Sequence, residues 1–270
     1  MGYRILGDVH NHTLYSRHAY STIAENVAGA KAAGLELLGS ADHFSSMLFP
    51  EQHIRNFQYF TNMDIWPRVW DGVCVLRACE ADILSLDGKL FGQDIPVTEN
   101  IVGHPDHRGG NLFERVTEGL DYVVASVHNR DFADGATLAQ TTGMYLSVLE
   151  NPKVFILGHT GRSGVPYDHD EVLLRAKELH KLIEINEHSF DLDPDGRCRK
   201  SCSAIAERCA ELGVGIAVSS DAHIACDLGK YAHVEDMLEE INFPEELIMD
   251  RGRDVFLAEL ATAGVCDIEL

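Results

Sequence analysis

Residues that bind metal ions recur along the chain, each after a short apolar segment. The first group reads Asp8-Val9-His10-Asn11-His12, and its two histidines, spaced i and i+2, would lie on the same side of a strand. The later groups are Asp42-His43, Glu80, His128, His159 and Asp221-Ala222-His223. Imidazole and carboxylate ligands together suit zinc, manganese or iron, and no cysteine joins them as it would in a closed structural zinc site. The sequence therefore predicts a metal site assembled from distant segments.

The apolar segments that precede these residues have the length of β-strands. They are 3–6, 35–39, 73–79, 122–126, 154–158, 182–186 and 215–219. Segments with helical character lie between them: 21–33, with Ser21 as the expected N-cap, and 200–212, which ends before Gly213. Strands alternating with helices predict an α/β fold with a mainly parallel sheet of about seven strands. In a barrel of this kind the strand exits meet at one rim, where active sites form.

The number of candidate ligands exceeds what one ion can use. At four to six ligands per ion, the set fits two or three ions, with Glu80 as a natural bridging carboxylate. A lone histidine is more often a hydrogen-bonded structural or surface residue, but chance placement of so many at strand exits is not expected. We assign the remaining histidines to that ordinary role: His53, His104, His107, His169, His180, His188 and His233.

Length and composition narrow the class of protein. A chain of 270 residues fits one domain, 1–270, with a long loop at about 91–114 that is rich in Gly, Pro, Asn and Asp. We expect that loop to act as a lid or as a contact in a homo-oligomer. The net charge of -21 disfavours long nucleic acids and anionic membranes as partners. Seven cysteines without a paired spacing, and no apolar run of membrane length, predict a cytoplasmic protein with reduced thiols and no membrane partner.

Several longer motifs match one known family. They are D-V-H-N-H-T at 8–13, H-A-Y-S-T at 18–22, A-D-H at 41–43, N-M-D-I-W-P-R-V-W-D-G-V at 62–73, E-I-N at 184–186 and S-D-A-H at 220–223. With these motifs the chain resembles the PHP (polymerase and histidinol phosphatase) superfamily, and within it the YcdX-like trinuclear zinc phosphatases. The resemblance implies a distorted (β/α)7 barrel with the metal site at the C-terminal ends of the strands. It also implies two or three divalent metal ions, zinc first, with manganese or iron as alternatives.

The resemblance further implies how the ligands divide among the ions, and it adds His18, which strand position alone does not indicate. The implied ligands are His10, His12, Glu80 and Asp221 for the first ion, His18, His43 and His223 for the second, and Glu80, His128 and His159 for the third.

These residues lead to a hypothesis of phosphomonoester hydrolysis on a small phosphorylated substrate. A metal-bridging hydroxide would attack phosphorus in line, with Glu80 and Asp221 as catalytic carboxylates. Arg17 and Arg162 are the candidates for a clamp on the phosphate oxygens. The proton for the leaving group would come from Asp221 or from a metal-bound water. Asp8 would either orient a ligand imidazole or make a hydrogen bond at the strand end.

Three other functions fit parts of the same pattern. The first is phosphodiester cleavage of short nucleotides, as in an exonuclease, although the acidic charge weighs against long nucleic acid. The second is an amidohydrolase, which also begins with an H-x-H strand but needs a bridging lysine that this chain does not offer after its fourth strand. The third is a non-catalytic scaffold stabilised by metal, which would be expected to lack one or more ligands.

Overall fold

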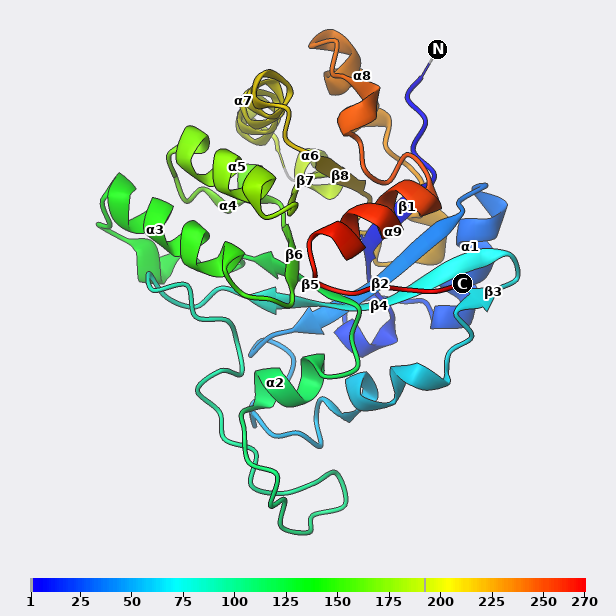
Figure 1. Cartoon of the computed structure of the whole chain (residues 1–270), viewed down its shortest axis with the longest axis vertical. Coiled ribbons are helices and arrows are strands. Elements are labelled where there is room, and N and C mark those ends of the chain that lie inside the picture. Colours follow the sequence, from blue (N-terminus) through cyan, green and yellow to red (C-terminus); the bar gives the residue numbers. More distant parts are fainter. Residues whose placement is uncertain (1, 192) are drawn as a thin grey trace.

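The computed structural model describes residues 2–191 and 193–270, which form a nearly closed barrel (Figure 1). The strands of its sheet are β1 Gly7–Asn11, β2 Leu37–Phe44, β3 Val69–Trp70, β4 Val73–Asp82, β5 Tyr122–Ser126, β6 Val154–Leu157, β7 Leu182–Asn186 and β8 Ile216–Ser219. Seven of them pair in parallel in the order β1-β2-β4-β5-β6-β7-β8, while β3 pairs antiparallel with β4. The predicted α/β barrel of seven parallel strands is confirmed.

Helices surround this barrel and close one of its ends. They are α1 Ile23–Ala32, α2 Leu112–Thr117, α3 Leu138–Leu149, α4 Thr160–Ser163, α5 His169–Glu178, α6 His188–Asp191, α7 Arg197–Leu212, α8 Ala232–Glu240 and α9 Arg253–Thr262. The C-terminal helix α9 differs from the others because its Phe256 and Leu260 belong to the same apolar cluster as residues from all seven parallel strands. Phe256 packs edge-on against Tyr122 and Phe155 there, so α9 plugs the barrel.

The predicted strand and helix limits are partly confirmed. The ranges 122–126 and 182–186 match β5 and β7, and α7 ends before Gly213 as expected. The predicted first strand at 3–6 is wrong: β1 pairs with β2 from Gly7 onward, and the N–H groups of both Leu6 and Gly7 donate to the Asp250 carbonyl. Ser21 is not the N-cap of α1. Thr22 fills that position in a capping box with Glu25, whereas the Ser21 hydroxyl accepts a hydrogen bond from the Ala225 N–H group.

The barrel is distorted where β8 meets β1, and Asp250 bridges this seam. Its backbone carbonyl accepts hydrogen bonds from the N–H groups of Leu6 and Gly7 at 3.0 and 2.9 Å. Its buried carboxylate accepts from the Val218 N–H group of β8 at 3.1 Å. Near the other end, the His12 N–H group donates to the Ala222 carbonyl at 2.9 Å, so the chain after β8 lies beside the end of β1.

Alternation along the strands directs one row of side chains from each into the barrel. On β4 this row is Cys74, Leu76 and Ala78 in the apolar interior, followed by Glu80 at the same period of two. On β5 the buried Tyr122 sends its hydroxyl across the interior to the Val9 carbonyl at 2.5 Å. A Cβ atom at Gly39 would lie 2.0 Å from that hydroxyl oxygen, so glycine is required at this position. Each interior row is therefore apolar at the base and polar toward the strand exits.

The segment 91–111 is irregular, as its composition predicts, and it projects from the barrel as a loop (Figure 1). Isolated bridges join Pro96 to Asn111 and Glu99 to Pro105, so the two arms of the loop run alongside each other. All seven cysteines are free thiols. Within 2–191 and 193–270, no helix is long and apolar enough to cross a membrane.

Candidate metal centre

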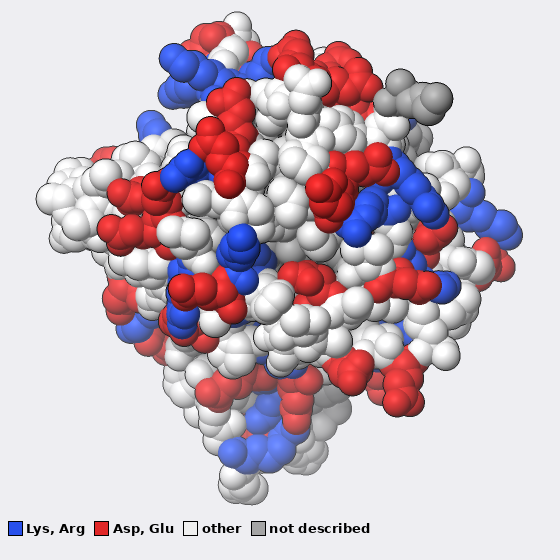
Figure 2. Space-filling model, turned by 45° about the horizontal axis from the view of Figure 1, so that its top comes forward, with Lys and Arg blue, Asp and Glu red and all other residues white. Residues whose placement is uncertain are grey.

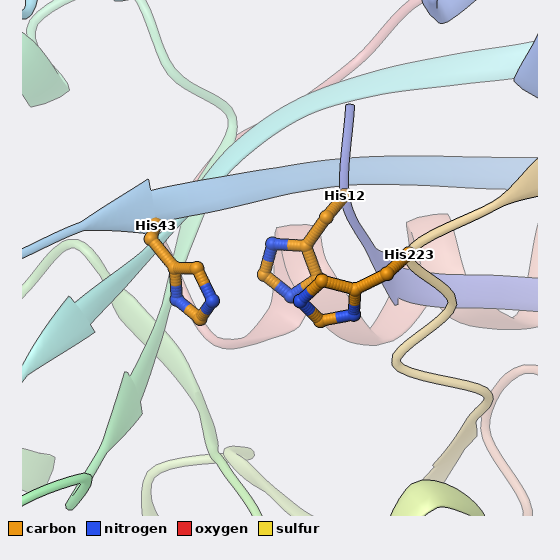
Figure 3. Close-up of side chains that lie close together, drawn as sticks. All are labelled: His12, His43 and His223. Atoms are coloured by element: carbon orange, nitrogen blue, oxygen red, sulfur yellow. The ribbon is translucent and has the colours of Figure 1, made fainter. Parts of the chain in front are cut away.

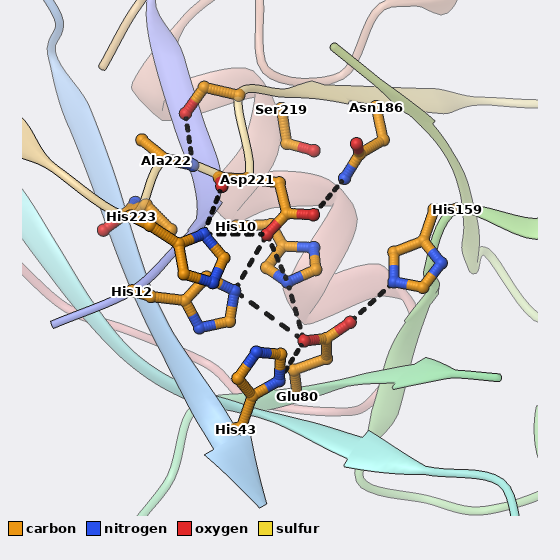
Figure 4. A network of polar contacts seen from close by, with 12 residues as sticks. His10, His12, His43, Glu80, His159, Asn186, Ser219, Asp221, Ala222 and His223 are labelled. Carbon is orange, nitrogen blue, oxygen red and sulfur yellow. Dashed lines mark hydrogen bonds and ion pairs between the residues drawn. The ribbon is translucent and has the colours of Figure 1, made fainter. Parts of the chain in front are cut away.

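The structure brings the nine predicted ligands together at the C-terminal ends of the strands, and Figure 4 shows most of them around Glu80 and Asp221. Three triads have ligand atoms that all lie within 4.8 Å of one another: His12, His43 and His223; His10, His12 and Asp221; and His43, Glu80 and His128. His12 and His43 each belong to two triads, so the groups share residues and form one continuous cluster. The division among ions implied by the sequence stays a prediction.

Glu80 lies at the centre of five imidazoles, three near its Oε2, where His12 Nε2 is the most distant at 3.7 Å, and two near its Oε1. Its Oε2 is 2.7 Å from His43 Nδ1 and 3.3 Å from His10 Nε2. Its Oε1 is 2.8 Å from His159 Nε2 and 3.3 Å from His128 Nε2. A carboxylate with imidazoles on both oxygens has the arrangement that bridges two cations, and this is how the sequence predicts Glu80 to act.

A second group of imidazoles lies beside Asp221. The rings of His12, His43 and His223 face one another (Figure 3). His18, from the loop after β1, places its Nε2 3.2 Å from His43 Nε2 and stacks on His223 at 4.7 Å between ring centroids. Asp221 Oδ1 lies 2.9 Å from His12 Nε2. The structure thus places His18 beside the residues with which the resemblance groups it.

Hydrogen bonds behind the imidazoles orient four of the rings. His10 Nδ1 lies 2.7 Å from Glu184 Oε1, and His128 Nδ1 lies 2.7 Å from Asp82 Oδ1. With these carboxylates as acceptors, each Nδ1 is the donor, which leaves the Nε2 lone pair directed at the cluster. His12 Nδ1 bonds to the Ser16 hydroxyl at 2.9 Å, and His223 Nδ1 bonds to the Asp221 carbonyl at 2.9 Å.

The orienting carboxylates were missed in the sequence analysis, which considered Asp8 for that role. Asp8 instead accepts hydrogen bonds from the Ser220 hydroxyl and the Gly229 N–H group, so the strand-end alternative is correct. Signals for Glu184 and Asp82 were present in the sequence. Glu184 is an acidic residue within an apolar segment, the one predicted strand that no candidate ligand follows. Asp82 comes two residues after Glu80, so it lies on the same face of β4.

Buried polar atoms that lack hydrogen-bond partners indicate whether cations fit this cluster. Among the described residues, His10 Nε2, His43 Nδ1, His159 Nδ1 and Glu80 Oε2 are buried and make no well-aligned hydrogen bond. Such atoms are costly unless an ion or water satisfies them. Nitrogen lone pairs and a carboxylate oxygen in one place form the donor set that zinc, manganese or iron binds, so the residues fit divalent cations.

The charges of the cluster also favour cations. Burial opposes ionisation of Glu80, yet His128, His10 and His43 hold the pKa of its carboxyl well below the usual value. Burial likewise opposes ionisation of Asp221, and His10, His12 and Arg162 outweigh that effect and keep its pKa well below normal. Burial and the neighbouring His43 lower the pKa of His12, which keeps its imidazole neutral. Despite burial, the carboxylates of Glu184 and Glu80 raise the pKa of His10, and those of Glu80 and Asp82 raise the pKa of His128 to about 10. Ionised carboxylates and neutral imidazoles are the forms that bind metal, so a cation bound here would displace the protons that the neighbouring acids favour on His10 and His128.

Two site residues have positive φ angles, which residues other than glycine rarely adopt. His159 has φ 28° and Asp221 has φ 56°, both in the left-handed region. Non-glycine residues adopt this region mainly where the surrounding structure enforces it, and such positions cluster at functional sites. Here the Glu184 carboxylate accepts the His159 N–H group at 2.6 Å, and the His10 carbonyl accepts the Asp221 N–H group at 2.9 Å.

The two predicted phosphate clamps have different positions. Arg162, at the end of the short helix α4, extends Nη2 to within 3.1 Å of Asp221 Oδ2. Its Nη1 is buried and has no hydrogen-bond partner among the described residues. Arg17 points elsewhere: its Nη1 donates to the Leu48 carbonyl at 2.6 Å, and its guanidinium lies over the Phe49 ring. The structure therefore brings Arg162, but not the guanidinium of Arg17, to the cluster.

A cavity of about 860 Å³ opens above the ligands, and we call it the histidine cavity. Its wall includes His18, His43, His128, His159, Arg162, Asp221 and His223. His188 and His233 line it too, although the sequence analysis gave them ordinary roles, and the His188 ring lies 6.2 Å from that of His223. No lining residue within the described part of the chain comes from the 91–114 loop. The volume is that of a small-molecule site.

Curated relatives of the chain are named as phosphatases, although no family model matches it. A probable phosphatase from Clostridium acetobutylicum is 35% identical over 261 residues, which cover 97% of this chain and 96% of the relative. Another, from Caldanaerobacter subterraneus subsp. tengcongensis, is 37% identical over 254 residues, which cover 94% and 90%. The chain belongs to this family of probable phosphatases.

Two solved structures share the fold at low sequence identity. Histidinol phosphate phosphatase from Lactococcus lactis subsp. lactis Il1403, complexed with zinc, L-histidinol and phosphate, has a TM-score of 0.53 and 16% identity, covering 89% of this chain and 95% of that chain. A chain of an archaeal ribonuclease P with mature tRNA has a TM-score of 0.53 and 12% identity, covering 95% and 90%. At these identities the likeness shows the fold alone.

Proposed function

We propose that this chain is a metal-dependent phosphomonoester hydrolase of the PHP type, most like the YcdX-like phosphatases. The observation that carries the proposal is the position of Glu80, which has three imidazoles near Oε2 and two near Oε1. Membership in a family of probable phosphatases supports the reaction class. The zinc and phosphate in the structure of the histidinol phosphate phosphatase, whose fold is shared, agree with the expected cofactor and substrate type.

Two or three divalent ions, zinc first, are the proposed cofactors. Their ligands are His10, His12, His18, His43, Glu80, His128, His159, Asp221 and His223. Ions held there would lower the pKa of water and neutralise phosphoryl oxygens. The three overlapping triads and the unpartnered buried atoms support more than one ion.

The other residues of the chain have separate proposed roles. Arg162 holds a phosphate oxygen with its unpartnered Nη1, while Nη2 remains on Asp221. Asp221 acts as an ionised ligand and not as the proton donor, because the residues around it keep its pKa low. Glu184 and Asp82 keep the imidazoles of His10 and His128 in the binding tautomer.

The test compares turnover of an aryl phosphomonoester with turnover of the matching diester. Purified protein is reconstituted with zinc or with manganese, and chelator-treated protein is the blank. The proposal predicts metal-dependent hydrolysis with the monoester preferred. Preference for the diester would replace the proposed monoesterase with a phosphodiesterase. If metal-loaded protein hydrolyses neither substrate, and no member of a panel of small phosphate esters, the result would favour a non-catalytic scaffold stabilised by metal.

A further inference from the structure

A second cavity of about 660 Å³ adjoins the histidine cavity, and we call it the arginine cavity. It lies between the segment after β5, the α4 segment and the start of α7. His128, Arg162 and Ser163 line both cavities, so these residues form their common wall. A substrate whose phosphate lies against Arg162 could therefore extend its alcohol part into the arginine cavity.

The arginine cavity is cationic in a chain that is strongly acidic. Arg130, Arg162 and Arg197 line it, together with two histidines. Acidic residues outnumber basic ones by 43 to 22 in the whole chain, yet no Asp or Glu is among the described residues that line this cavity. On the face shown in Figure 2, acidic and basic side chains are interspersed. The separation of charge inside the arginine cavity is thus a local feature.

The three guanidinium groups are short of partners. Among the described residues, the Arg130 guanidinium donates only to the neutral Gly164 carbonyl, at 3.3 Å. Arg162 pairs its Nη2 with Asp221 but keeps its buried Nη1 without a partner, and Arg197 makes no ion pair with any described residue. Elsewhere the chain pairs arginines with carboxylates, as in Arg68 with Asp121 and Arg208 with Asp170. Guanidinium groups that converge on a cavity with N–H groups that no described carboxylate accepts are suited to an anion.

The backbone N–H groups at the start of α7 are not available to an anion in the arginine cavity. The first N–H groups of this helix, from Cys198 and Arg199, already donate to the Asp193 carboxylate at 2.9 and 2.8 Å. The positive end of the helix is therefore satisfied within the protein. An anion in the arginine cavity would be bound by guanidinium forks, whose geometry matches the oxygens of phosphate.

We propose that the arginine cavity binds a second anionic group of the substrate, with phosphate as the best match, while the first phosphate occupies the metal centre. This inference rests on the proposed function and adds the substrate class: small phosphomonoesters whose alcohol part carries a second oxyanion. Arg130 and Arg197 determine this specificity, and Arg162 lies between the two anions.

The test measures binding, so it does not depend on turnover. Metal-loaded protein is titrated by calorimetry with alkylphosphonates of increasing chain length and with the same compounds carrying a terminal sulfonate. The sulfonate is an anion but a poor metal ligand, so tighter binding of the sulfonated compound measures the contribution of the arginines and not of the metal ions. We expect at least tenfold lower Kd for the sulfonated compound at one chain length. We also expect this advantage to weaken as ionic strength rises.

A double variant, Arg130→Gln with Arg197→Gln, should lose that advantage, whereas Arg208→Gln on the outer face of α7 should keep it. Equal Kd values with and without the sulfonate at every length, or an advantage that survives in the double variant, would overturn the inference. Turnover of the aryl phosphomonoester is measured in parallel on wild-type protein. If turnover occurs without the sulfonate advantage, the arginine cavity has no such role and the proposed function stands. If the advantage appears without turnover, the proposed function fails and the anion site remains.

Discussion

Glu80 and the two acids that orient imidazoles, Glu184 and Asp82, have different roles in the site. The carboxylate of Glu80 faces five imidazoles directly, whereas Glu184 and Asp82 contact the Nδ1 atoms on the far side of the His10 and His128 rings. Glu184 also accepts hydrogen bonds from the Ser219 hydroxyl and the His159 N–H group. One buried carboxylate thus fixes the positions of two ligands on different strands.

We predict that Glu184→Gln lowers metal affinity by about 10- to 100-fold without unfolding the protein, because the amide cannot replace every contact of the carboxylate. Chelator competition measures the affinity, and circular dichroism checks the fold. Glu178→Gln, at a surface position of α5, is the control. Unchanged metal affinity in Glu184→Gln would show that the carboxylate does not support the ligands.

Arg162 is predicted to act on the substrate and not on the metals. Arg162→Lys should lower kcat/KM for an aryl phosphomonoester by about 10- to 100-fold, because lysine cannot make both contacts of the guanidinium fork. Metal content, measured by mass spectrometry, should stay at the wild-type level. Arg175→Lys on the outside of α5 serves as the matched control. A loss of metal equal to the loss of activity would contradict this assignment.

The strands place the ligands because each interior row changes from apolar to polar along its length. Leu37, Gly39 and Ala41 precede His43 on β2, as Cys74, Leu76 and Ala78 precede Glu80 on β4. The apolar part forms the core, and the polar part forms the site at the strand exits. The site and the core are thus made by the same strands.

The close approach of β2 to Tyr122 offers a test of this packing. Gly39→Ala should lower the free energy of unfolding by about 1 to 3 kcal/mol, because the new methyl group would overlap the Tyr122 hydroxyl. Tyr122→Phe removes that hydroxyl, so the double variant should lose less stability than the sum of the two single variants. Denaturant unfolding measures all four proteins. Additive losses would mean that the two residues do not compete for the same space.

The sequence allowed the number of parallel strands to be predicted because buried parallel strands are nearly continuous apolar runs. It did not predict that β1 begins at Gly7, because the partner of the Leu6 and Gly7 N–H groups is Asp250, more than 240 residues away. The nine ligands were predicted from motifs, and they converge. The roles of Glu184 and Asp82 depend on which ring nitrogen they reach, and spacing along the chain does not reveal that.

The molecule as a whole is closed at the β8–β1 seam by a buried acid. Burial raises the pKa of the Asp250 carboxyl well above its usual value, despite the hydrogen bond from the Val218 N–H group. An acid whose pKa is higher in the folded state favours folding most below its unfolded pKa of about 4. That contribution is lost as the pH rises through the folded pKa.

We therefore predict that Asp250→Asn gains stability relative to wild type as the pH rises above about 4, by at most about 1.4 kcal/mol per pH unit. The amide oxygen can still accept the Val218 N–H group, so the fold should persist. Unfolding by denaturant is measured from pH 4 to 8, with the exposed Asp254→Asn as the control. A stability difference that does not change with pH would contradict the prediction.

Metal stoichiometry and activity, measured together, test the central claim most directly. Chelator-stripped protein is titrated with zinc while hydrolysis of an aryl phosphomonoester and bound metal per chain are followed. We predict no hydrolysis without metal, full activity at two or three ions per chain, and loss of both activity and metal in Glu80→Ala. Full activity in the stripped protein, or wild-type turnover in Glu80→Ala, would contradict the assignment of Glu80 as the carboxylate at the centre of a catalytic metal site.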